Sequence, residues 1–157
     1  MSINEWSDAT AMAEAVQNKT VSPRELVEAT IREAERTNPK INAIVSQRYE
    51  KALKEAEARD FSEKPFAGVP IFLKDLGQKQ AGEPSTAGSR LFTSYHAKET
   101  DSYVKKLEEL GFIILGRSST PEFGFKISVM LRFMVLLTCL MMSRVMLVAQ
   151  VVVRQLL

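Results

Sequence analysis

Residues 68–75 read GVPIFLKD, and this stretch decides which fold the sequence can adopt. Gly68 and Pro70 break helices, and the apolar residues around Pro70 suit a buried strand. A glycine-rich loop follows, then a predicted helix over residues 101–110, and then FIILG at residues 112–116, which predicts a second buried strand. Strand, loop, helix and strand in this order predict a parallel βαβ unit and an α/β fold.

The segment before this unit reads as two helices within residues 6–37. The second begins with Ser22 as its N-cap, Pro23 at its first position and Glu25 completing a capping box. Because proline cannot continue a helix, we expect the second helix to end before Pro39.

Shorter elements complete the predicted secondary structure. Residues 41–47, INAIVSQ, predict a short strand, and residues 49–59 predict a helix. In the βαβ unit, Thr100 can cap the helix and Gly111 terminates it.

Charge, histidine and cysteine content narrow the functional classes. Removing the three arginines of residues 127–157 from the 21 basic side chains leaves 18 against 19 acidic ones, so we expect no nucleic-acid partner. His96, the only histidine, lies in a polar loop without a cluster of ligands, so we expect it to be exposed and expect no metal. Cys139 is the only cysteine, which suits a reducing compartment. Residues 1–10 contain no signal segment, and we expect a cytoplasmic protein.

Lys74 is the candidate catalytic residue. It follows an apolar strand directly, and burial of an amine lowers its pKa because desolvation disfavours the charged form. A neutral lysine is a competent general base that can activate a hydroxyl nucleophile. The alternative is a lysine that extends to solvent at a strand end and pairs with Asp75.

Several ordered motifs extend the argument beyond one residue. GVPIFLKD is followed by AGEPSTAGSR at residues 81–90 and by LGFIILGRSSTPEFGF at residues 110–125. In this order the motifs resemble the amidase signature family of amide hydrolases, over residues 1–126. Two positions depart from the family pattern, since Leu110 stands where alanine is usual and Ser119 where asparagine is common.

The resemblance implies both a fold and a mechanism. The fold is α/β, an incomplete amino-terminal portion with a helical entry and then a mixed β-sheet flanked by helices. The mechanism uses a Ser–cisSer–Lys triad without a cofactor, acts on a small-molecule amide, and matches its lysine to Lys74. The bridging serine is the first serine of a Gly-Gly-Ser-Ser-Gly-Gly loop, and the nucleophilic serine lies beyond it. Ser118, Ser119 and Glu122 are implied to line or support the site; the substrate-binding residues stay unknown.

Residues 127–157 differ in character from the sequence before them. They contain no Gly, Pro, Asp, Glu or Lys, and their only charges are Arg132, Arg144 and Arg154. Their longest uncharged run, residues 133–143, is too short for a bilayer span of about 20 residues. We therefore do not expect a membrane anchor.

A shifted reading frame explains this tail. Written with suitable codons and read one base out of register, residues 145–157 spell Asn-Ala-Gly-Gly-Ser-Ser-Gly-Gly-Ala-Ala-Ala-Val, which contains the family loop. The bridging serine then falls at Gln150 and its neighbour at Val151. We interpret residues 1–126 as the amino-terminal part of an amidase domain and residues 127–157 as an out-of-frame tail.

This interpretation predicts a catalytically inactive chain, because the general base is present without the serines. Unpaired strand edges and the run VAQVVV at residues 148–153 predict self-association or aggregation, which a cooperatively melting monomer would contradict.

Two alternatives stay open. The first is an inactive amidase-like domain whose hydrophobic C-terminal helix binds a membrane or a partner protein. The second is a fragment of an A-type amidotransferase subunit. Residues 76–90 resemble general or cyclic-amide hydrolases more than that subunit.

Overall fold

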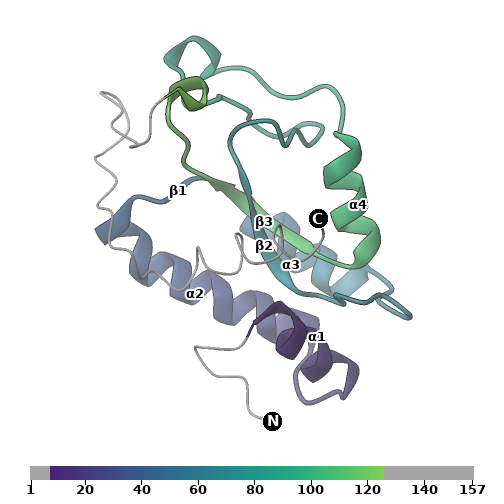
Figure 1. Cartoon of the computed structure of the whole chain (residues 1–157). Coiled ribbons are helices and arrows are strands. Elements are labelled where there is room, and N and C mark those ends of the chain that lie inside the picture. The colour runs from purple at the N-terminus through teal and green to yellow at the C-terminus, as the bar shows by residue number, and fades with distance from the viewer. Residues whose placement is uncertain (1–7, 126–157) are drawn as a thin grey trace.

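The computed structural model describes residues 8–125, which form helices around a small sheet (Figure 1). The predictions for residues 126–157, including the out-of-frame tail, lie outside the described residues. The elements are α1 (Ala9–Gln17), α2 (Pro23–Ile41), β1 (Ile44–Gln47), α3 (Tyr49–Ala58), β2 (Pro70–Lys74), α4 (Ser102–Leu110) and β3 (Ile113–Ser118), with short 3₁₀ turns at Arg90–Phe92 and Glu122–Gly124.

The three strands form one mixed sheet in the order β1, β3, β2. β2 and β3 run parallel and α4 lies between them in the chain, which confirms the predicted βαβ unit. β1 pairs with the other edge of β3 in the antiparallel sense. The predicted mixed α/β architecture is therefore confirmed.

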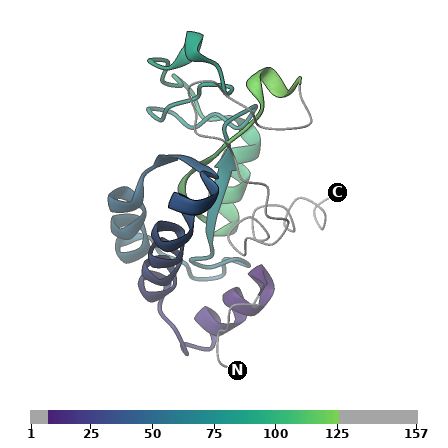
Figure 2. The same cartoon turned by 90° about the vertical axis from the view of Figure 1, so that its left-hand side faces the viewer.

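Helices cover both faces of this sheet (Figures 1 and 2). α1 and α4 pack on one face, where Leu73 of β2 and Ile114 of β3 are buried. α2 and α3 pack on the other face, against Phe72 and Ile113. Neighbouring strand residues thus point to opposite faces, and both faces are apolar because both are covered.

The predicted start of α2 is confirmed. Ser22 Oγ accepts a hydrogen bond from the backbone N–H of Glu25 at 3.2 Å, and the Glu25 carboxylate accepts one from the backbone N–H of Ser22 at 2.8 Å. Pro23 occupies the first helical position, as predicted. The two hydrogen bonds satisfy N–H groups that have no partner within the helix, and Pro23 has no N–H group that needs one.

The predicted end of α2 is wrong. The helix passes through Pro39 and continues to Ile41. Proline removes one hydrogen bond of the last turn, but Ile41 is buried in the core. The side chain of Asn38 also binds the backbone N–H and C=O of Ile44. Burial and this bridge to β1 offset the missing hydrogen bond.

The predicted cap of α4 is also wrong. Asp101, not Thr100, is the N-cap residue, and its side chain makes no capping bond. Thr100 Oγ1 instead accepts from the backbone N–H of Ala81 at 3.0 Å, and the Asp101 carboxylate accepts from that of Lys79 at 2.8 Å. Both side chains therefore hold the loop after β2. Gly111 terminates α4 in the left-handed conformation, as predicted.

β3 is longer than the predicted strand and runs to Ser118. The pairing register shifts at Gly116, whose φ is 151°, and a Cβ there would lie 2.1 Å from the carbonyl oxygen of Ser46. This close approach requires glycine. The extension buries Arg117 and Ser118, which lie beyond the strand predicted at residues 112–116.

Candidate active site

Lys74 lies at the carboxyl end of β2, in register with Ser118 at the end of β3. α/β proteins commonly bind ligands outside this end of parallel strands. The side chain is half-buried, and burial lowers the pKa of its amine. Among residues 8–125, no carboxylate forms an ion pair with Lys74. The amine is thus partly desolvated without a counter-ion, which favours the neutral form that accepts protons.

Asp75 does not pair with Lys74, so the ion pair of that alternative is wrong. The Asp75 side chain is buried, and its carboxylate accepts hydrogen bonds from the backbone N–H of Thr86, at 2.9 Å, and from the Thr86 hydroxyl. The backbone N–H of Asp75 donates to the carbonyl oxygen of Ser118 at 3.0 Å. Asp75 therefore anchors the loop after β2 to the end of the sheet.

The loop that contains Thr86 also contacts the loop after β3. Ser89 Oγ donates to Glu122 Oε1 at 2.7 Å. Gly88 packs against the backbone so closely that a Cβ would lie 2.6 Å from the carbonyl oxygen of Thr120. Glu122 therefore supports this loop.

The two serines after Gly116 lie beside the site without a general base. Ser118 Oγ donates to the carbonyl oxygen of Leu73 at 3.3 Å and so joins the ends of β3 and β2. Ser119 Oγ is buried and has no hydrogen-bond partner within residues 8–125. Within residues 8–125, neither serine therefore forms the hydroxyl–base pair of an activated nucleophile.

Two residues that the sequence analysis did not single out contact the backbone of Lys74. Gln78 Oε1 accepts from the N–H of Lys74 at 2.6 Å. Arg117 Nη1 donates to the carbonyl oxygens of Lys74 and Gln78, at 3.3 and 2.8 Å. Burial lowers the pKa of the Arg117 guanidinium, although nearby carboxylates oppose this effect. The only sequence signal was a basic residue directly after the strand glycine, which does not reveal burial.

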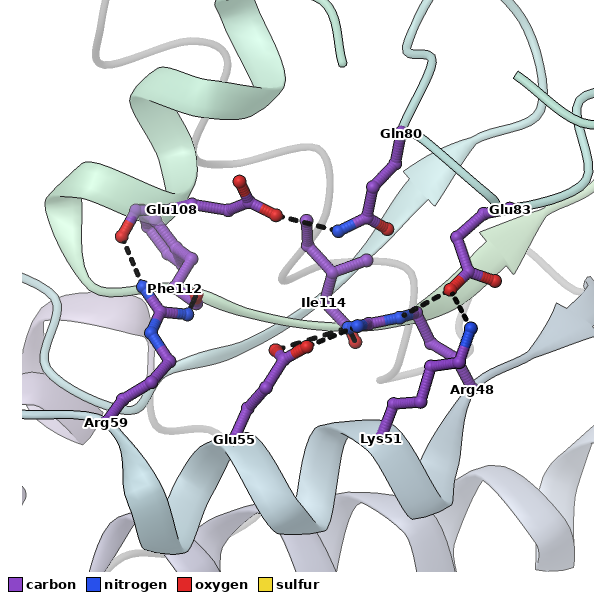
Figure 3. A network of polar contacts seen from close by, with 9 residues as sticks. All are labelled: Arg48, Lys51, Glu55, Arg59, Gln80, Glu83, Glu108, Phe112 and Ile114. Atoms are coloured by element: carbon purple, nitrogen blue, oxygen red, sulfur yellow. Dashed lines mark hydrogen bonds and ion pairs between the residues drawn. The ribbon is translucent and has the colours of Figure 1, made fainter. Parts of the chain in front are cut away.

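A polar network holds the loop between β2 and α4 against α3 (Figure 3). Arg48 donates to the carbonyl oxygen of Ile114 at 2.6 Å and pairs with Glu55 and, at 3.4 Å, with Glu83. Lys51 Nζ lies 2.7 Å from Glu83 Oε1. Glu83 belongs to the loop that also contains Thr86, so the network supports the anchor of Asp75.

Glu83 gives this network a pH dependence. Burial alone would raise the pKa of Glu83, but the hydrogen bonds and charges of Lys51 and Arg48 lower it overall from 4.5. The stabilisation is therefore present above pH 4.5 and is lost as the pH falls through the lower folded-state value. Glu83→Gln is expected to cost about 1 kcal/mol near neutral pH and almost nothing in acid.

Urea unfolding at neutral and acidic pH measures this difference. Glu99→Gln, at an exposed position in the same loop, is the matched control. An equal loss for Glu83→Gln at both pH values would contradict the assignment.

His96 is exposed, as predicted, and its Nδ1 lies 3.2 Å from the carbonyl oxygen of Ser94. Residues 8–125 contain no group of three or more His, Cys, Asp or Glu side chains placed to hold a metal ion. In that same range no helix has the length and apolar character to cross a bilayer. Cys139 lies outside the described residues.

Comparison with known proteins gives a consistent set of matches. The family described as Amidase matches residues 25–130. The 6-aminohexanoate-cyclic-dimer hydrolase of Paenarthrobacter ureafaciens is 38% identical over 125 residues, which cover 78% of this chain and 25% of that protein. Lipoamidase of Enterococcus faecalis is 40% identical over 124 residues, which cover 78% of this chain and 17% of that protein.

Solved structures give the same picture. The structure of 6-aminohexanoate cyclic dimer hydrolase complexed with substrate matches with a TM-score of 0.78 at 36% identity, over 84% of this chain and 27% of that one. A bacterial aryl acylamidase matches with a TM-score of 0.71 at 32% identity, over 79% of this chain and 27% of that one. The chain therefore spans about a quarter or less of the length of the relatives that it matches.

Proposed function

The chain belongs to the amidase family, and from this premise we propose that it is part of an amide hydrolase in which Lys74 is the general base. One observation carries the proposal. A half-buried amine with a lowered pKa and no ion pair within residues 8–125 lies at the carboxyl end of a parallel strand. Near neutral pH a larger fraction of such a group is uncharged, and so available to accept a proton, than of an exposed lysine.

In the proposed reaction, two serines outside residues 1–126 complete the site. Lys74 takes a proton from the bridging serine, which takes one from the nucleophilic serine. The nucleophile's oxygen then bonds to the amide carbon, and backbone N–H groups stabilise the resulting oxyanion. The C–N bond breaks as the proton held by Lys74 returns through the bridging serine to the leaving amine. Water then releases the acyl group by the same proton relay.

The proposed substrate is a small-molecule amide. Support comes from the names of the relatives, which include a cyclic-dimer hydrolase, a lipoamidase and an acylamidase. We propose no nucleic-acid partner, because residues 1–126 have no excess of basic side chains. We propose the cytoplasm as the compartment, because the single cysteine suits a reducing environment.

We also propose that residues 127–157 are translated one base out of register. The support is that residues 145–157 can be written in codons that, read one base out of register, encode a Gly-Gly-Ser-Ser-Gly-Gly loop. The first serine of that loop would fall at Gln150 and would supply the bridging serine that Lys74 requires. Residues 1–126 would then continue, in the shifted frame, into the rest of an amidase.

The experiment that tests Lys74 uses a coding sequence with the frame moved back by one base after Lys126. This protein is expected to hydrolyse small amides, such as the cyclic dimer of 6-aminohexanoate. Lys74→Ala is expected to lower kcat by about 10²–10⁴-fold, the usual contribution of a general base. Lys98→Ala, at an exposed position, is the control and should keep full activity. Equal kcat for the two variants would contradict the role of Lys74.

A further inference from the structure

Side chains, rather than the neighbouring strand, bind the backbone N–H and C=O of Lys74. The next residue, Asp75, points its N–H toward β3, where it donates to the carbonyl oxygen of Ser118 at 3.0 Å. Because successive strand residues point their backbone groups in opposite directions, those of Lys74 point away from β3. There the N–H meets Gln78 Oε1 at 2.6 Å, and the C=O meets Arg117 Nη1 at 3.3 Å.

Arg117 closes the turn that follows Lys74. The same Nη1 atom donates to the carbonyl oxygen of Gln78 at 2.8 Å, so a single nitrogen joins both ends of the turn. Arg117 lies in β3 beside Leu73, the residue before Lys74, and therefore links the turn to the neighbouring strand. Gly77, with a φ of 66°, supplies the reversal between the two ends.

This arrangement buries the charged guanidinium of Arg117, which costs free energy. Arg117 is only 2% exposed, and within residues 8–125 its Nε and Nη2 atoms have no hydrogen-bond partner. No carboxylate of those residues forms an ion pair with it, although Asp75, Glu83 and Asp101 act on its charge at longer range. A buried cation without a direct counter-ion is costly, and proteins retain such costs where position matters to function.

We propose that Arg117 is a positioning residue that, with Gln78, fixes the backbone of Lys74 and so directs its amine toward the bridging serine. The inference rests on the proposed role of Lys74 as the general base. Arg117 acts only through the carbonyl oxygens of Lys74 and Gln78, and has no contact with the reacting atoms.

Two variants of the frame-restored protein test this inference. In Arg117→Met and in Gln78→Ala, hydrogen exchange of the Lys74 amide is expected to be about five- to tenfold faster, since each change removes a hydrogen bond at this turn. Pulse labelling of lysine amines with acetic anhydride at a series of pH values gives a second readout. The midpoint for Lys74 is expected to rise toward that of exposed Lys98, because a released amine becomes more solvated.

Arg59→Met is the matched control. Arg59 also joins two backbone carbonyl oxygens, those of Phe112, at 3.0 Å, and Glu108, at 2.5 Å, near the start of β3. Its loss is expected to lower stability while the exchange and labelling of Lys74 stay unchanged. Arg117→Lys keeps a donor and is expected to restore part of the wild-type behaviour.

Each outcome decides a separate point. Wild-type exchange and labelling of Lys74 in both folded variants would overturn the inference, as would an equal change in Arg59→Met. Should Arg117→Met not fold, Gln78→Ala decides, because it leaves the buried arginine in place. A wild-type Lys74 that titrates together with Lys98 would contradict its proposed role as a base, while amide exchange would still test the positioning.

Discussion

A polypeptide of residues 1–157 alone is expected to hydrolyse no amide above the background rate. It contains Lys74, but its sequence as written has no Gly-Gly-Ser-Ser-Gly-Gly loop to supply the proposed bridging serine. Catalytic groups that act as a unit fail together: in subtilisin, loss of the nucleophile alone costs about as much as loss of the whole triad, about 10⁶ in rate. We expect a loss of about that size relative to a frame-restored protein.

Amine release from small aliphatic and aryl amides measures this loss. Lys74→Ala in the 157-residue polypeptide should change nothing, because a base without a hydroxyl to activate contributes nothing to the rate. Turnover by the purified polypeptide that disappears in Lys74→Ala would show that it has another nucleophile, and would contradict the account of the missing serines.

Gly116→Ala is expected to have the largest effect on folding. A Cβ at this position would lie 2.1 Å from the carbonyl oxygen of Ser46, a backbone atom that cannot move without breaking the pairing of β1 with β3. The φ of 151° adds strain for any residue with a side chain. A loss above about 4 kcal/mol is expected, which is a large part of the 5–15 kcal/mol typical of a whole domain.

Gly82→Ala separates the two causes of this loss. Gly82 also has a positive φ, 77°, but an added Cβ would meet nothing within 4 Å. It should lose about 1–2 kcal/mol from backbone strain alone. Soluble yield and urea unfolding of the frame-restored protein compare the two variants, and equal losses would show that the contact with Ser46 does not determine the effect.

Local signals in the sequence predicted well the parts of the fold that depend on neighbouring residues. The capping box of Ser22 and Glu25 is complete within four residues, and Gly111 ends α4 because only a local left-handed turn is needed. The parallel βαβ unit followed from the order of apolar and helical segments, and the family resemblance is confirmed by the match over residues 25–130.

The wrong predictions concern segments whose structure depends on contacts with residues distant in the sequence. Pro39 stays helical because Ile41 is buried and Asn38 binds Ile44 of β1, contacts that a local rule does not contain. Thr100 binds Ala81 across the loop instead of capping its own helix. In each case a tertiary contact outweighs the preference of the segment.

The candidate site shows the same difference between features that local sequence predicts and features that depend on distant contacts. Lys74 could be found from its place after an apolar strand, and its half-burial agrees with that expectation. The roles of Asp75, Gln78 and Arg117 could not be found in this way, because they depend on how the loop after β2 returns to the end of β3. Side chains that hold the backbone of a distant turn have no sequence pattern of their own.

The most direct test of the whole account is the nucleotide sequence that encodes residues 126–157. We predict that, one base out of register, it continues the amidase and contains codons for Gly-Gly-Ser-Ser-Gly-Gly. The first serine of this loop is expected at the position of Gln150. A shifted frame that lacks this loop, or that reaches a stop codon before it, would contradict the proposed origin of the tail and the reason given for the missing activity.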